Sequence, residues 1–154
     1  NRWKSGFRMF YEHPIFGWGP GTYQFKYAPF QHSEEKTIIS TNAGDKGNAH
    51  SEYIGPLAEA GLLGMLTVIA IVVLVSYSSV RIYKKSQNKE IKFLVLVSFI
   101  SLFTYFIHGS LNNFLDTDKA SVPFWGLIAI IVALDVYHLK PGLSADKPRE
   151  KQES

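Results

Sequence analysis

The histidine His50 stands two residues before Glu52 and nine before Glu59, in the stretch "NAHSEYIGPLAEAGLLG". Histidine titrates near neutrality, so His50 can take a proton from a hydroxyl group or orient that hydroxyl by hydrogen bonding. Glu52 and Glu59 could orient the imidazole or a substrate. The alternative for His50 is a surface or helix-capping histidine. For the two acids, capping and packing are the readings we favour.

Two arginines, Arg2 and Arg8, lie near the start of the chain. The planar guanidinium group matches phosphate oxygens in a bidentate manner, and its charge stabilises a departing phosphate. These residues are therefore candidates for phosphate binding. The alternative is that they contact lipid headgroups from a helix on the membrane surface.

Three apolar segments must position these residues: 62–80, 93–108 and 122–139. A helix of about 20 apolar residues spans a bilayer. Three such segments in succession, joined by short polar links, argue against a soluble protein. We predict an all-α membrane protein in which residues 1–61 form an outer loop of short helices and the three segments form transmembrane helices. The charged residues 140–154 are predicted to be a disordered tail.

Lysine and arginine predict the orientation. The link between the first two segments carries Arg81, Lys84, Lys85, Lys89 and Lys92, whereas the next link carries only Lys119. By the positive-inside rule, the first link and the tail are cytoplasmic. Residues 1–61 and the second link then lie outside. Asp135, late in the third segment, is costly in a membrane unless it is paired or near the boundary, and we expect it to reach the interface.

The outer loop contains two predicted helices. The first, over residues 2–13, is amphipathic and lies on the membrane surface or under the bundle; His13-Pro14 ends it. Its aromatic face consists of Trp3, Phe7, Phe10 and Tyr11. A glycine-rich turn follows, and the alternation around Tyr23 and Tyr27 suggests an extended stretch. The second helix starts either with Ser51 as its cap or with Pro56 in its first turn, and Gly61 ends or bends it.

Composition excludes several classes of function. Without cysteine the chain has no disulfide, no cysteine metal ligand and no cysteine nucleophile. The net charge of +3 lies mostly beside the apolar segments, so it indicates topology and not nucleic-acid binding. The chain begins at Asn1 without a signal-peptide pattern, and we expect the C-terminal part of a larger membrane protein.

Two motifs resemble the O-antigen ligase and polymerase superfamily of bacterial inner-membrane glycosyltransferases. The first is the turn "HPIFGWGPG", which carries His13, Pro14, Gly17, Gly19 and Gly21. The second is "HSEYIGPLAEAGLLG", which carries His50, Ser51, Ile54, Glu59, Gly61, Leu62 and Gly64. The resemblance covers roughly residues 2–75. The stretch "LNNFLDTDKASVPFWG" is also similar to the C-terminal region of some ligase-like members.

The resemblance implies a glycan donor carried on polyprenyl pyrophosphate and a hydroxyl acceptor, such as lipid A-core or another glycan. It implies no metal, cofactor or nucleotide sugar, and an active site at the periplasmic face of the inner membrane, among membrane lipids. The family's functional histidine corresponds to His50, and its arginine to Arg2. Within this class, the alternative to a ligase is a polymerase of the same superfamily. Outside this class, the alternative is a non-catalytic membrane protein of glycan export.

The motif Asp116-Thr117-Asp118 reads D-x-D, which some glycosyltransferases use to bind a metal and a nucleotide sugar. Nucleotide sugars are cytoplasmic, whereas this link is predicted to lie outside. A polar link or a role near the acceptor therefore fits it better than a metal site. Among the other histidines, His108 lies on the outer side and is the second candidate.

Overall fold

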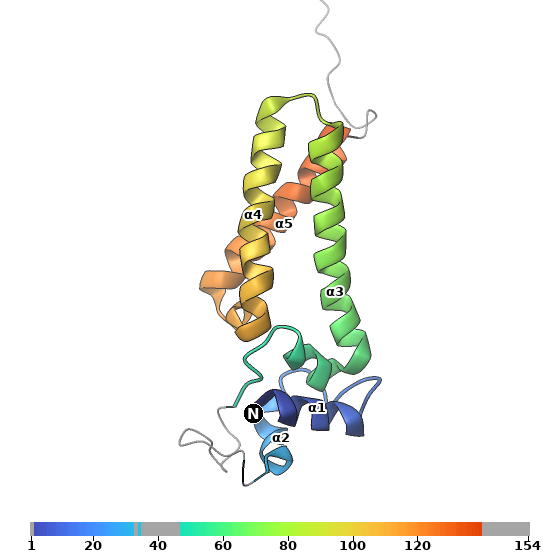
Figure 1. The fold of residues 1–154 in the computed structure, drawn as a ribbon, viewed down its shortest axis with the longest axis vertical. Helices are drawn as coiled ribbons and strands as arrows, with labels where there is room; N and C mark the ends of the chain where they lie inside the picture. Colours follow the sequence, from blue (N-terminus) through green and yellow to red (C-terminus); the bar gives the residue numbers. More distant parts are fainter. Residues whose placement is uncertain (1, 33, 35–46, 140–154) are drawn as a thin grey trace, which may run out of the picture.

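The computed structural model describes residues 2–32, 34 and 47–139, and in this part of the chain every regular element is a helix. Three long helices form a bundle: α3 (Ile54–Lys85), α4 (Lys89–Leu111) and α5 (Asp118–Leu139). The short helices α1 (Arg2–Glu12), α2 (Tyr23–Lys26) and η1 (Ala28–Phe30) lie at one end (Figure 1), and η3 (Phe114–Asp116) joins α4 to α5. The predicted all-α class is confirmed. The predicted tail, residues 140–154, lies outside the described residues.

All three long helices are long and apolar enough to cross a membrane. Each is longer than its apolar segment; α4, for example, extends from the predicted 93–108 to 23 residues. At 1.5 Å per residue such a helix is roughly 34 Å long, enough for a bilayer core of about 30 Å. Asn88 caps α4 by accepting a hydrogen bond from the Glu90 amide.

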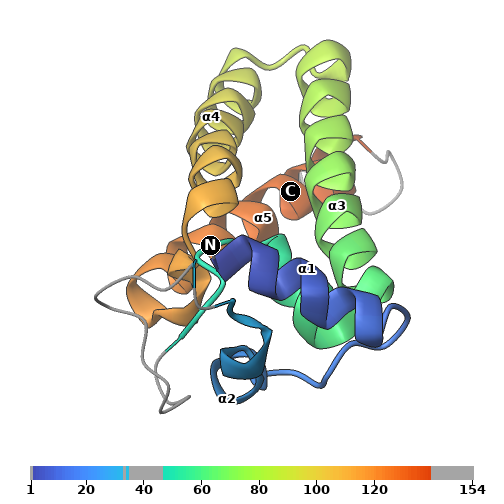
Figure 2. The ribbon, with the colours of Figure 1, turned by 60° about the horizontal axis from the view of Figure 1, so that its bottom comes forward.

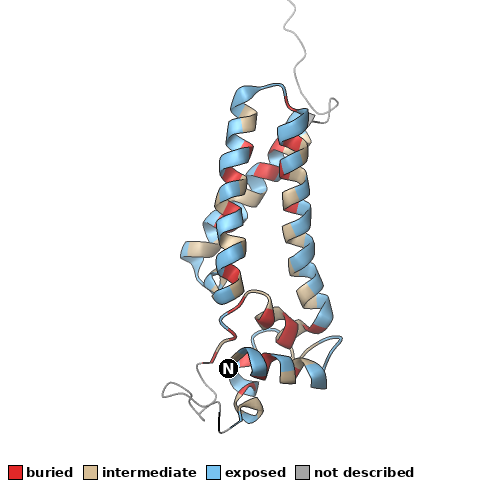
Figure 3. Ribbon diagram, in the orientation of Figure 1, coloured by how far each residue is buried: buried red, intermediate tan, exposed pale blue. Residues whose placement is uncertain are grey.

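The bundle core is a narrow stripe on each helix, seven residues apart, as in coiled-coil packing. The fully or nearly buried pairs are Val75 and Ile82 on α3, Val95 and Leu102 on α4, and Phe124 and Ile131 on α5. The outward faces of the same helices are apolar and exposed (Figure 3). Such faces fit lipid or further helices better than water.

Asp135 is paired with a basic residue of another long helix, which is one of the two conditions expected for it. Its carboxylate pairs with Arg81, with Nη2 at 3.0 Å from Oδ1 and 3.2 Å from Oδ2. The two side chains join α5 to α3 near the end of the bundle opposite α1. Pairing removes much of the cost that an isolated carboxylate carries in a membrane helix.

Helix α1 lies across the end of the bundle beneath the start of α3 (Figure 2). Its buried face consists of the small residues Ser5 and Gly6 with Met9. A Cβ on Gly6 would lie 2.7 Å from Ile54 Cγ2, so close packing requires glycine there. The predicted aromatic face points away from the protein, and Tyr11 is 77% exposed. The helix ends at Glu12, as the His13-Pro14 pair predicts.

The extended stretch predicted around residues 23–27 was wrong. The segment forms α2, and Tyr23 at its start stacks on Tyr27 at its C-cap, with ring centroids 5.6 Å apart and planes at 3°. Both rings are buried. The alternation of aromatic and polar residues therefore reflected spacing by four along a helix, not by two along a strand.

Candidate functional site

His50 sits in a tight turn just before α3. Its φ of +47° lies in the left-handed region, which non-glycine residues seldom occupy. The Asn48 side chain stabilises this turn by accepting a hydrogen bond from the His50 amide at 3.2 Å. On the other side, Ser51 Oγ accepts from the amides of Tyr53 and Ile54, both at 3.3 Å. A serine turn and an asparagine turn thus hold His50 on the surface.

Helix α1 brings Arg2 to His50 across 48 positions of sequence. Arg2 Nη1 lies 2.5 Å from His50 Nε2 and 3.5 Å from the Asn48 carbonyl. The Tyr23 hydroxyl donates to the Arg2 carbonyl at 2.6 Å, which ties the start of α1 to α2. A guanidinium group only donates, so Nε2 must accept and the ring is neutral with its proton on Nδ1.

The electrostatics of the site also favour the neutral imidazole. Partial burial, and next the Arg2 charge, lower the pKa of His50 below its usual value. Neutral imidazole is the form that can take a proton from a hydroxyl. Burial also raises the pKa of the Tyr23 hydroxyl, so this group stays a hydrogen-bond donor.

Arg8 contacts a different part of the loop. Its Nη1 donates to the Phe30 carbonyl at 2.7 Å and so joins α1 to η1. Six residues along a helix correspond to about 9 Å of rise and a different face. The structure therefore brings Arg2, the other predicted phosphate ligand, to His50 and turns Arg8 toward η1.

The Glu59 carboxylate holds the glycine-rich turn. Its oxygens accept from the Gly21 and Tyr23 amides, both at 2.9 Å, and its own carbonyl accepts from the Gly19 amide at 2.7 Å. The first two bonds satisfy amides at the start of α2, where a negative charge is favourable. Glu59 thus connects the two motifs, because its carboxylate and its carbonyl both accept from backbone amides of the glycine-rich turn.

Gly61 bends α3, as its position predicts, with φ +65° and ψ −155°. This conformation is essentially restricted to glycine. The bend brings the turn so close that a Cβ on Gly61 would lie 2.4 Å from the Ile15 carbonyl oxygen. The Leu62 amide donates to the Pro14 carbonyl at 2.8 Å across the same contact. The two motifs are therefore the two sides of one backbone interface.

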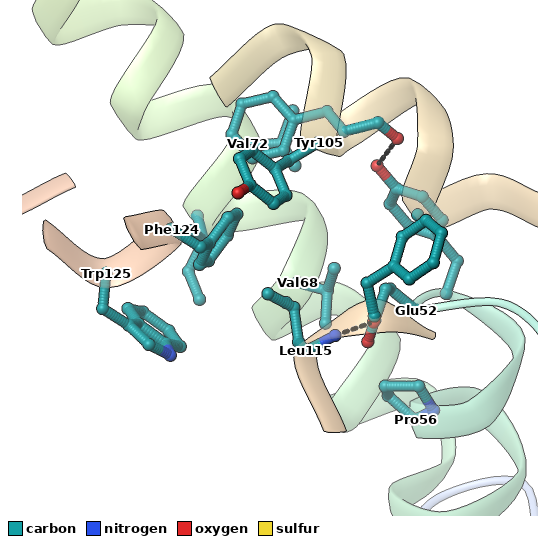
Figure 4. A pocket seen from close by; sticks show the side chains of 13 residues that line it. Glu52, Pro56, Val68, Val72, Tyr105, Leu115, Phe124 and Trp125 are labelled. Atoms are coloured by element: carbon teal, nitrogen blue, oxygen red, sulfur yellow. Dashed lines mark hydrogen bonds between the residues drawn. The ribbon is translucent and has the colours of Figure 1, made fainter. Parts of the chain in front are cut away.

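Glu52 connects the His50 turn to the link between α4 and α5. Its amide donates to the Gly109 carbonyl at 2.7 Å, and its Oε1 accepts from the Leu115 amide at 2.8 Å (Figure 4). Burial raises the pKa of the Glu52 carboxyl; the Leu115 hydrogen bond opposes this, and the nearby Asp116 charge adds to it. Glu52 thus fixes the start of α3 against the other long helices.

The remaining candidates lie in different environments. Asp116 accepts a hydrogen bond from the Asn113 side chain. His108 packs its ring against Phe114, with centroids 6.5 Å apart, and His13 packs against Trp18 at 4.3 Å. Within the described ranges no three histidine or carboxylate side chains are grouped to hold a metal ion.

Sequence reasoning overlooked Asn48 and the role of Tyr23. An asparagine two residues before a candidate histidine is the pattern of a side-chain turn, so that signal was present. The hydrogen bond from the Tyr23 hydroxyl to Arg2 had no local signal, because it joins residues 21 positions apart.

Residues 1–69 match the family model described as O-antigen ligase. The matched range holds α1, the glycine-rich turn, the His50 turn and the bend of α3. No curated protein and no solved structure matches the chain.

Proposed function

Because the chain belongs, through residues 1–69, to the O-antigen ligase superfamily, we propose that it transfers a glycan from polyprenyl pyrophosphate to a hydroxyl of lipid A-core. Family and helices together indicate a multi-pass protein of the bacterial inner membrane. We place the His50 end of the bundle at the periplasmic face. The contact between Arg2 and His50 carries the proposal, since it joins a phosphate-binding group to a base.

In the proposed reaction the acceptor hydroxyl gives its proton to Nε2 of His50 as its oxygen attacks the anomeric carbon of the donor sugar. The bond from that carbon to the pyrophosphate oxygen breaks, and polyprenyl pyrophosphate leaves with the bonding electrons. Arg2 stabilises the charge that develops on the leaving group. The charge of Arg2 supplies this stabilisation without a metal.

The contact between Arg2 and His50 in the site without substrate constrains the order in which donor and acceptor engage. Arg2 occupies Nε2, the only nitrogen of the neutral ring with a free electron pair. His50 can accept a proton only after Arg2 has turned away. A donor pyrophosphate would attract the guanidinium and expose the imidazole, so we expect the donor to bind before the acceptor reacts.

A replacement of His50 by alanine in the full-length protein tests the function. We expect a loss of transfer on the order of 10²–10⁴-fold, the usual contribution of a general base. Cells should then show lipopolysaccharide with bare core while long glycan accumulates on the lipid carrier. The exposed His32 provides the matched control, because His32→Ala makes the same change outside the site.

Gel electrophoresis of this lipopolysaccharide also separates a ligase from a polymerase and from an exporter. A polymerase variant would leave core that carries a single repeat unit. Unchanged lipopolysaccharide at normal protein level would contradict catalysis by His50 and would favour a non-catalytic exporter.

A further inference from the structure

A polar cavity of about 570 Å³ lies beside the His50 turn. Four segments line it: the turn at residues 21–24, residues 47–52, the first turns of α3, and the link at residues 113–116. Ala49 and Ser51, the two neighbours of His50 in sequence, both line it. His50 therefore stands at the edge of a space large enough for a small ligand.

The lining chemistry suits sugar hydroxyls. The residues that line the cavity include ones with amide or carboxylate side chains: Gln24, Asn48, Glu52, Asn113 and Asp116. Amides both donate and accept, and ionised carboxylates accept, so together they complement hydroxyls that do both. Such groups give orientation and specificity in ligand sites.

The charge of the cavity opposes phosphate. Of the described residues that line it, three are acidic (Glu52, Glu59 and Asp116), and none is lysine, arginine or histidine. A pyrophosphate would meet like charges here, and like charges at short range repel strongly outside bulk water. Arg2, which does not line the cavity, is the group suited to the phosphate.

An apolar cavity lies next to the polar one. It has a volume of about 130 Å³, lies between α3, α4 and α5, and shares Glu52 and Pro56 with the polar cavity. Val68, Val72 and Phe124 contribute to its apolar wall (Figure 4). Adjacent polar and apolar spaces at the end of membrane-spanning helices fit an amphiphile.

We propose that the polar cavity is the acceptor subsite, which binds the sugars of a lipid-anchored, hydroxyl-bearing glycan. The lipid side of this acceptor lies toward the apolar cavity, and Arg2 is left for the phosphate of the donor. This assignment rests on the proposed function. It places the acceptor sugars beside acidic residues and the donor phosphate beside Arg2, and both substrates lie next to His50.

Steady-state kinetics of the full-length protein in nanodiscs test the subsite, with rough lipopolysaccharide as acceptor and a polyprenyl-pyrophosphate glycan as donor. Glu52→Gln and Asp116→Asn remove charge but keep an oxygen for Leu115 and Asn113. We expect each to raise the acceptor KM about tenfold, the cost of a lost hydrogen bond to a charged group, and to leave the donor KM unchanged. Glu90→Gln, the same change on an exposed residue in the first turn of α4, should alter neither.

A binding measurement decides the subsite even without turnover. Dephosphorylated core oligosaccharide should give saturation-transfer NMR signals with the wild-type protein, weaken about tenfold with Glu52→Gln, and resist displacement by inorganic pyrophosphate. Equal binding by both proteins, displacement by pyrophosphate, or a rise in donor KM would overturn the subsite. Core binding without any transfer by the wild-type protein would overturn the proposed function alone.

Discussion

At the scale of single residues, the site depends on the contact between Arg2 and His50. Partial burial and, next, the Arg2 charge lower the pKa of His50. The guanidinium group also occupies the nitrogen that would take the proton. A bound phosphate would relieve both effects of the guanidinium group. The base would thus become stronger when the donor is in place.

Replacing Arg2 with glutamine should raise the pKa of His50 toward its ordinary value. The positive charge of Arg2 is then removed, and only the partial burial of the ring still disfavours imidazolium. Histidine side-chain NMR over a pH titration measures this directly. Arg8→Gln, the same change on the same helix but toward η1, should leave the His50 pKa unaltered. Equal pKa values in the wild-type and Arg2→Gln proteins would contradict the contact.

Glu59→Gln should destabilise the loop. The carboxylate accepts with both oxygens, from Gly21 and Tyr23, whereas an amide side chain has only one acceptor oxygen. One amide of the turn then loses its partner, at a cost of about 1–3 kcal/mol in unfolding free energy. Faster hydrogen exchange at the Gly21 or Tyr23 amide would report the loss. Unchanged exchange at both would show that the carboxylate does not hold the turn.

At the scale of elements, the backbone interface between the glycine-rich turn and the bend of α3 positions the whole loop. Gly17 and Gly61 both have φ of +65°, and a Cβ on either would lie 2.4 Å from backbone atoms of the other segment. This explains why each motif has glycine at that position. Their role in the structure is close approach, and the chemical groups lie next to them.

Gly61→Ala should therefore separate the turn from α3. The new methyl group meets the Ile15 carbonyl, and the residue cannot readily adopt φ +65° with ψ −155°. We expect a loss of at least about 2 kcal/mol in unfolding free energy, measured by detergent-induced unfolding. Gly126→Ala in α5 is the matched control, because nothing lies within 4 Å of its added Cβ. A stable Gly61→Ala protein with an ordered turn would contradict the interface.

Local sequence predicted the elements that depend on local properties. Apolar length indicated three membrane helices, and Gly61 indicated a bend. The prediction of an extended stretch around Tyr23 was wrong because Glu59, 36 residues away, supplies acceptors that favour a helix start. The aromatic face of α1 was identified but not its direction, because packing against Ile54 selects the smaller Gly6 face.

The sequence predicted which residues form the candidate site better than it predicted how they are arranged. His50 and Arg2 could each be selected by type and by family resemblance. Their contact joins residues 48 positions apart, so no local pattern could reveal it. The same holds for the hydrogen bond between Glu52 and Leu115, 63 positions apart, which brings the link between α4 and α5 to the site.

At the scale of the whole molecule, the two ends of the bundle differ. One end carries the loop helices, the His50 turn and the link that Glu52 holds. Near the other end, the pair of Arg81 and Asp135 joins α3 to α5. The bundle core between these ends is a narrow apolar stripe, so the polar contacts contribute much of the specificity of helix pairing.

Asp135→Ala should destabilise the bundle more than removal of both charges. The single change leaves Arg81 without its partner among apolar helices, whereas Arg81→Met with Asp135→Ala leaves no charge. The pair is partly exposed, at 30% and 18%, so we expect roughly 1–3 kcal/mol for the single variant, below the cost for a fully buried pair. Detergent-induced unfolding measures both. A double variant as unstable as the single one would show that packing, not charge, is lost.

The proposed orientation predicts which end of the bundle faces the periplasm. The described chain alternates sides, with residues 2–32 and the link at 112–117 at one end and the link at 86–88 at the other. Because the sequence contains no cysteine, single thiols can be placed at the exposed Thr117 and Gln87. A membrane-impermeant maleimide should label Thr117→Cys in spheroplasts and Gln87→Cys only in inverted vesicles. The reverse pattern would put His50 in the cytoplasm, away from any periplasmic acceptor, and would contradict the proposed reaction.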